Sequence, residues 1–220
     1  MNNKTRKKYM YKYAERYDIS IPRGFRPNID AFGKPARSLA FNILRHAGKM
    51  RYVVPSLQFD DLITPMPVKV MEVVRSQLGT REWPPFSNKG EVLKYLRAAG
   101  ITFPAPWCAS FVTWCLKKAG LRGLPDKPGW VPAWEAWAEH RGWIVPKHKA
   151  RKGDIVTFQF DSDATGDHIG FVTNNLGIVK GITTIEGNAT SDAAPGGGVV
   201  RKWRSWNQVH RVIRIPDYPA

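Results

Sequence analysis

The segment Pro106-Trp-Cys-Ala-Ser-Phe-Val-Thr-Trp-Cys115 constrains the fold more than any other part of the chain. Its apolar spacing predicts an amphipathic helix with Cys108 in the first turn. Downstream come Asp167-His168-Ile-Gly-Phe-Val and then Ile185-Glu186-Gly-Asn188. A thiol at a helix start, a histidine opening a strand and an acid-amide pair on a later strand indicate a cysteine hydrolase. The positive end of a helix and a nearby imidazolium both favour the thiolate, which is the nucleophile.

The order of predicted elements favours an α+β fold. Helical stripes come first and extended segments with turn signals follow, which is typical of helices packed on a mostly antiparallel sheet rather than of alternating βαβ units. The predicted helices cover residues 68–78, 90–99, 108–120 and 131–140. The predicted strands cover residues 155–160, 168–173, 181–186, 198–203 and 208–215.

The chain has two cysteines, Cys108 and Cys115. Seven residues on one helix separate their Cα atoms by about 10 Å along the axis. A disulfide needs roughly 4.4–6.8 Å, so the two cysteines are predicted not to pair. Cys115 lies well inside the helix after two aromatic residues and is predicted to be a small core residue.

The net charge of +16 is unevenly distributed. Residues 1–55 carry 13 Lys and Arg against 3 Asp and Glu, whereas residues 56–220 carry 21 against 15. Such an excess implies an anionic partner: nucleic acid, anionic lipid or bacterial cell wall. Charge alone does not choose among them.

A division of the chain near residue 62 is predicted from the change in pattern. Residues 1–62 form a basic arm that faintly resembles the opening of a helical peptidoglycan-binding module, and residues 63–216 form the catalytic domain. Neither a membrane span nor a signal peptide is recognised, because the basic start is followed by Tyr-rich sequence rather than an apolar run. The expected site of synthesis is therefore a host cytoplasm, with action on the wall after release.

Residues 67–216 resemble the CHAP family, the cysteine- and histidine-dependent amidohydrolase/peptidases of the papain-like group. Five pieces match in order: Leu78-Gly-Thr-Arg-Glu-Trp-Pro-Pro-Phe-Ser-Asn88, Pro106-Trp-Cys-Ala-Ser-Phe-Val, Gly153-Asp154-Ile-Val, Asp167-His-Ile-Gly-Phe-Val and Ile185-Glu-Gly-Asn. The resemblance implies a papain-like fold and cleavage of peptidoglycan amide bonds. These bonds lie in the stem and bridge peptides or between muramic acid and L-alanine.

Four catalytic roles are expected. Cys108 attacks the carbonyl, and His168 takes the thiol proton and later gives it to the leaving amine. Glu186 and Asn188, two apart on a strand and therefore predicted to share a face, orient the imidazole or contact the oxyanion, with Glu186 the preferred orienter. The backbone N–H of Cys108 is a candidate oxyanion donor. This chemistry needs no metal and no cofactor.

Aromatic residues near these motifs offer candidate groove walls. Trp107, beside the nucleophile, is the predicted substrate-binding residue. Trp130, Trp134 and Trp137 recur at helical spacing and are predicted to be mostly core.

Three carboxylates, Asp161, Asp163 and Asp167, surround the Gly166 turn and are a weak candidate for calcium. A solvated hairpin turn is favoured, because the twelve-residue calcium loop with its closing Glu is missing.

Two classes of function remain open. The preferred one is a phage-type endolysin, or a similar virion-associated lysin, acting as an amidase or an endopeptidase. The other is a non-catalytic cationic wall-binding module on a papain-like scaffold. In both, the partners are peptidoglycan and anionic wall polymers rather than nucleic acid, and the protein is expected to be a monomer.

Overall fold

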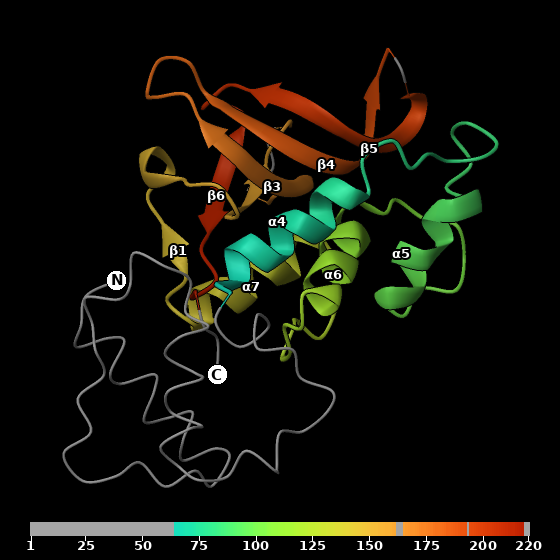
Figure 1. The fold of residues 1–220 in the computed structure, drawn as a ribbon, viewed down its shortest axis with the longest axis horizontal. Helices are drawn as coiled ribbons and strands as arrows, with labels where there is room; N and C mark the ends of the chain where they lie inside the picture. Colours follow the sequence, from blue (N-terminus) through green and yellow to red (C-terminus); the bar gives the residue numbers. More distant parts are fainter. Residues whose placement is uncertain (1–63, 162–164, 193, 218–220) are drawn as a thin grey trace, which may run out of the picture. The chain divides into compact units, whose positions relative to one another are not determined.

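The computed structural model describes residues 64–161, 165–192 and 194–217. Over these residues the fold is α+β, as predicted, with helices packed on an antiparallel sheet (Figure 1). The predicted basic arm, residues 1–62, and its boundary lie outside the described residues and stay predictions. None of the described helices is long and apolar enough to cross a membrane.

Within residues 64–161, four α-helices precede the main part of the sheet, where the sequence predicts helices. Each predicted boundary is close to the observed one, because proline or a polar turn precedes each stripe and glycine follows it. The helices are α4 (Met66–Ser76), α5 (Leu93–Ala98, entered through a 3₁₀ turn at Gly90–Val92), α6 (Cys108–Lys118) and α7 (Val131–His140).

In the described part of the chain, six strands form one sheet in the order β1-β6-β2-β3-β4-β5, and every neighbouring pair is antiparallel. Five of them were predicted, and β4 and β5 extend beyond the predicted ends to form a long hairpin. Only β1 was missed, because it has two residues and depends on pairing with β6. The strands are β1 (Ile144–Val145), β2 (Ile155–Phe158), β3 (His168–Asn175), β4 (Ile182–Ser191), β5 (Ala194–Arg204) and β6 (Val209–Ile213).

Helix α6 packs against β3 and β4 and forms the centre of the core. Its Phe111 ring meets the Phe171 ring of β3 edge-on, with 6.1 Å between centroids. Cys115 is fully buried and both cysteines are free, which confirms the predictions made for them. The side chains of α6 and of the sheet that pack together are buried. This packing holds the first turn of α6 at a fixed place beside β3 and β4.

Candidate active site

Cys108 is the first residue of α6. Pro106, which has no N–H to donate, and Trp107, whose φ of −124° is not helical, end the preceding loop. The first helical hydrogen bond runs from the Phe111 N–H to the Trp107 carbonyl, 2.8 Å. The thiol, in a residue that is 7% exposed, therefore lies at the positive end of an eleven-residue helix.

Trp107 lies behind the thiol in the core, not in a groove. It is 0% exposed, its indole Nε1 donates to Glu82 Oε1 at 2.8 Å, and its ring stacks on Tyr95 with 5.3 Å between centroids. The prediction that Trp107 forms a wall of the substrate groove is therefore wrong. Trp107 precedes the first helical residue and has non-helical dihedral angles, so its side chain does not follow the direction of Cys108.

His168 opens β3 and is brought to Cys108 from the sheet. Its Nε2 lies 3.0 Å from Glu186 Oε2, and the Cys108 side chain lies close enough to the ring to affect its pKa. Burial alone would lower the pKa of His168, but the hydrogen bonds and charges of Cys108 and Glu186 outweigh it and raise the pKa to about 9. The imidazole is therefore protonated at neutral pH.

Glu186 lies on β4, where its side chain contacts the imidazole of His168, and it is 0% exposed. Its Oε1 accepts from Thr184 Oγ1 at 2.6 Å and from Arg204 Nε at 2.9 Å, and its Oε2 accepts from Arg204 Nη2 at 2.5 Å. Burial alone would raise the pKa of Glu186, but the hydrogen bonds and positive charges of Arg204 and His168 lower it to about 2. The carboxylate stays ionised although it is buried.

Sequence reasoning did not identify Arg204, the last residue of β5. Its guanidinium lies over the rings of Phe158 and Phe160, with 5.1 and 5.0 Å to their centroids. The same two rings flank the imidazole of His168 at 5.9 and 6.1 Å. A buried carboxylate requires a cation, and a search of the neighbouring strands on that ground would have identified Arg204.

Gly170 makes room for the carboxylate. It pairs with Glu186 across β3 and β4, and a Cβ added to it would lie 2.6 Å from Glu186 Cγ. The Glu186 side chain therefore crosses the empty glycine position, and His168 lies two residues earlier on the same strand.

Asn188 lies in a bulge of β4. The register with β5 shifts between Glu186 and Ala189, and Asn188 has a left-handed φ of 54°. The two-residue alternation on which the predicted shared face was based is interrupted there. The catalytic role of Asn188 stays a prediction.

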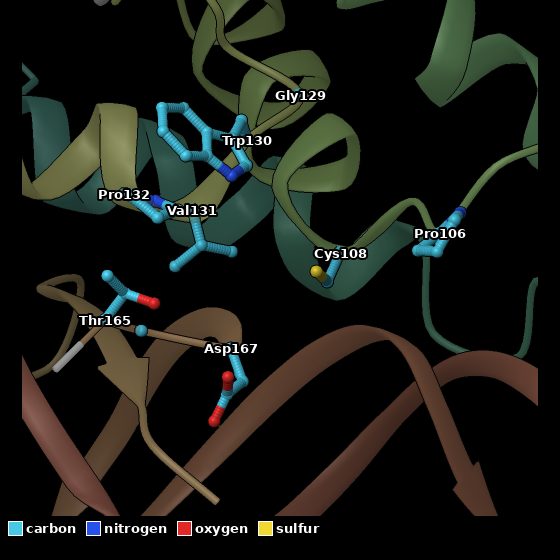
Figure 2. A pocket seen from close by; sticks show the side chains of 9 residues that line it. Pro106, Cys108, Gly129, Trp130, Val131, Pro132, Thr165 and Asp167 are labelled. Carbon is cyan, nitrogen blue, oxygen red and sulfur yellow. The ribbon is translucent and has the colours of Figure 1, made fainter. Parts of the chain in front are cut away.

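Cys108 faces a pocket of about 300 Å³, which lies at the small end of the range for ligand sites. Figure 2 shows its sulfur pointing toward the side of the pocket that Val131 and the loop with Thr165 and Asp167 form. Trp130 lines this pocket and is 56% exposed, so its predicted place in the core is wrong. Trp134 and Trp137 are buried as predicted.

In the acidic turn between β2 and β3, the carboxylate of Asp167 has a structural role. Asp167 Oδ2 accepts the Phe160 N–H at 2.6 Å and so closes the turn. Asp163 lies outside the described residues, and among the residues that are described no three His, Cys, Asp or Glu side chains form a group able to hold a metal ion. Asp154, by contrast, pairs with Arg214 at 2.7 Å and accepts the Arg151 N–H, which fixes the turn before β2.

Gly187 allows α6 to approach β4, and a substitution there should disturb the site. A Cβ at this position would lie 2.6 Å from Phe111 Cβ and Cγ and 2.8 Å from Trp107 Cζ3. We expect Gly187→Ala to move the start of α6 and lower the rate of Cys108 alkylation by roughly tenfold, since overpacking shifts backbone. Thr190→Ala, an exposed position on the same strand, is the control. Equal alkylation rates in both variants would show that the contact does not position the thiol.

Residues 100–188 match the family model of the CHAP domain. This part of the chain is therefore similar to the CHAP domain family. The CHAP match contains Cys108, His168, Glu186 and Asn188, so the four predicted catalytic positions all lie within it. No curated protein matches the chain in sequence.

Two solved structures similar to the chain come from Mycobacterium tuberculosis. For Rv1477, a hypothetical invasion protein, the identity is 16% and the TM-score 0.42. The alignment covers 70% of this chain and 63% of that one. For the peptidoglycan hydrolase RipB, the identity is 15% and the TM-score 0.39. The alignment covers 91% of this chain and 96% of that one. The chain thus spans less than two thirds of the first structure.

Proposed function

We propose that the protein is a cysteine-dependent hydrolase that cleaves an amide bond of bacterial peptidoglycan. One observation carries the proposal: Cys108 lies at a helix start and faces a pocket, its side chain raises the pKa of the neighbouring His168, and the buried Glu186 carboxylate contacts that imidazole. Nucleophile, base and orienting group in this order can perform acyl transfer.

In the first half-reaction the Cys108 thiolate attacks the carbonyl carbon of the amide. Because Glu186 contacts Nε2, the ring nitrogen left for the thiol is Nδ1. A C–S bond forms, and the carbonyl oxygen becomes an oxyanion. The C–N bond then breaks as the imidazolium of His168 gives its proton to the departing amine, and a thioester to Cys108 remains.

In the second half-reaction water replaces the amine. Neutral His168 takes a proton from the water, whose oxygen attacks the thioester carbonyl. The C–S bond breaks, a carboxylic acid leaves, and Cys108 returns to the thiolate paired with protonated His168. Glu186 stays ionised throughout and stabilises the imidazolium whenever it forms.

The start of α6 supplies the expected oxyanion donor. Cys108 is the first helical residue, so its N–H lies among the four that have no acceptor within the helix. It also belongs to the residue that forms the thioester. Donors aimed at the developing charge stabilise the transition state in a site from which water is excluded.

The proposed substrate class is supported by family and by charge. The CHAP domain implies peptidoglycan, with the cut in the stem or bridge peptides or between muramic acid and L-alanine. The net charge of +16 suits the anionic polymers of a bacterial wall. The role of a phage-type endolysin, released from a host cytoplasm onto the wall, stays a prediction.

Purified wall tests the proposal directly. We expect the protein to lower the turbidity of a peptidoglycan suspension, and pre-treatment with iodoacetamide to abolish this clearing, because the reagent blocks the thiolate. A cationic binding module without catalytic activity would instead pellet with the wall and leave the turbidity unchanged. Clearing that survives complete alkylation of Cys108 would refute the cysteine mechanism.

A further inference from the structure

We propose that Arg204 is a positioning residue that keeps the Glu186 carboxylate ionised and in one orientation, so that Glu186 can hold His168 against Cys108. This inference rests on the proposed function, because it assigns a role within the same site. Arg204 lies on β5, outside residues 100–188.

Arg204 forms a hydrogen bond with each of the two carboxylate oxygens of Glu186. Its Nε and Nη2 donate to the two different oxygens of Glu186, at 2.9 and 2.5 Å. A planar fork on both oxygens fixes the plane of the carboxylate, which a single ammonium cannot do. Thr184 Oγ1 adds a donor to Oε1, so Oε2 remains the oxygen that faces His168.

Burial of Glu186 and Arg204 strengthens the electrostatic interaction between them. Glu186 is fully buried and the side chain of Arg204 is only 14% exposed, so water screens the pair weakly. Three groups face the two central residues, Glu186 and His168: Thr184 on β4 and Arg204 on β5 face Glu186, and Cys108 on α6 faces His168. The charges alternate from Arg204 to His168: guanidinium, carboxylate, imidazolium.

The aromatic residues couple Arg204 to the imidazole in a second way. Phe158 and Phe160 are stacked on each other, 6.0 Å apart, and both the guanidinium and the imidazole pack against them. One pair of rings thus limits the movement of both cations.

Loss of the guanidinium should change the pH dependence as well as the rate. Without Arg204 the carboxylate loses its strongest partner, so Glu186 takes up a proton at higher pH and no longer stabilises the imidazolium. We expect Arg204→Gln to lower wall clearing by roughly 10- to 100-fold at pH 7.5. The loss should be larger again at pH 5. Arg204→Lys, which keeps the charge but not the fork, should lie between Arg204→Gln and the unmodified protein.

Arg201→Gln is the matched control. Arg201 lies on the same strand, is exposed and carries the same charge. Its removal lowers the net charge equally, and hence wall binding through charge, without touching Glu186. We expect Arg201→Gln to change clearing by the same factor at pH 5 and pH 7.5. A structural role for Arg204, without an effect on ionisation, would give a pH-independent loss in Arg204→Gln too, and that result would overturn the proposal.

A double-mutant cycle tests whether Arg204 acts through Glu186. In a Glu186→Gln background, Arg204→Gln should add less than about a threefold loss, because the interaction is already absent. A full second loss would overturn the proposal. A single variant that leaves one buried charge unpaired could fold poorly. In that case the double variant Glu186→Gln/Arg204→Gln, which leaves no buried charge unpaired, is compared with the single variant that folds.

The alkylation rate of Cys108 as a function of pH separates this proposal from the proposed function, because it needs no substrate. An acid limb that moves to higher pH in Arg204→Gln, in a protein that clears no wall, would support the role of Arg204 and refute the hydrolase. Wall clearing together with an unmoved acid limb would support the hydrolase and overturn the role of Arg204.

Discussion

Replacing Cys108 by alanine should abolish wall clearing, with a loss of at least about 10⁴-fold, down to the background of the assay. The thiol forms the C–S bond, and among the described residues that line the pocket Cys108 is the one with a thiol. The side chain is small and nearly buried, so Cys108→Ala should fold and should still pellet with peptidoglycan.

Cys115→Ala is the matched control for Cys108→Ala. Both cysteines lie on α6 and both are free, but Cys115 is fully buried, two turns along the helix. Burial raises the pKa of the Cys115 thiol well above its usual range, so this thiol is unreactive. We expect Cys115→Ala to retain clearing within about threefold. Equal activity in both variants would contradict the assignment of Cys108 as the nucleophile.

Replacing His168 by alanine should lower the clearing rate by about 10³-fold, since the imidazole serves as both acid and base. His140→Ala is the control, because His140 is exposed at the end of α7 and takes no part in the described site. The measurement is the initial rate of clearing, with a thermal melt to show that both variants fold. Activity in His168→Ala equal to that in His140→Ala would refute the role of His168.

The same assignment predicts the alkaline limit of the unmodified protein. The pKa of His168, raised to about 9, means that the imidazolium is present below that pH and lost above it. The pair of thiolate and imidazolium is therefore lost, and activity falls, as the pH rises through about 9. An alkaline midpoint near 6.5, the ordinary value for a histidine, would show that Cys108 and Glu186 do not stabilise the protonated ring.

Sequence reasoning worked best where a local signal decides the structure. The helices α6 and α7 begin where a proline and a change of pattern predict them, and Cys108 is the first residue of α6 as expected. His168 likewise opens its strand, and it contacts Glu186 as the matched motifs imply.

Sequence reasoning failed where a contact between segments distant in the sequence determines the position of a side chain. Trp130 fits the helical spacing of Trp134 and Trp137, but it is the N-cap residue before α7. The helical periodicity therefore does not determine where its ring points. Trp107 turns away from its neighbour Cys108 into a bond with Glu82. No local pattern indicates that pairing, or the pairing of Arg204 with Glu186.

The most direct test of the central claim counts the groups that appear when the wall is cut. Amide hydrolysis releases one amine and one carboxylate for each bond broken and no new reducing sugar. We predict that purified peptidoglycan treated with the protein gains free amino groups in step with clearing, that reducing ends stay constant, and that Cys108→Ala releases neither. New reducing ends, or amine release that survives Cys108→Ala, would contradict a cysteine-dependent amide hydrolase.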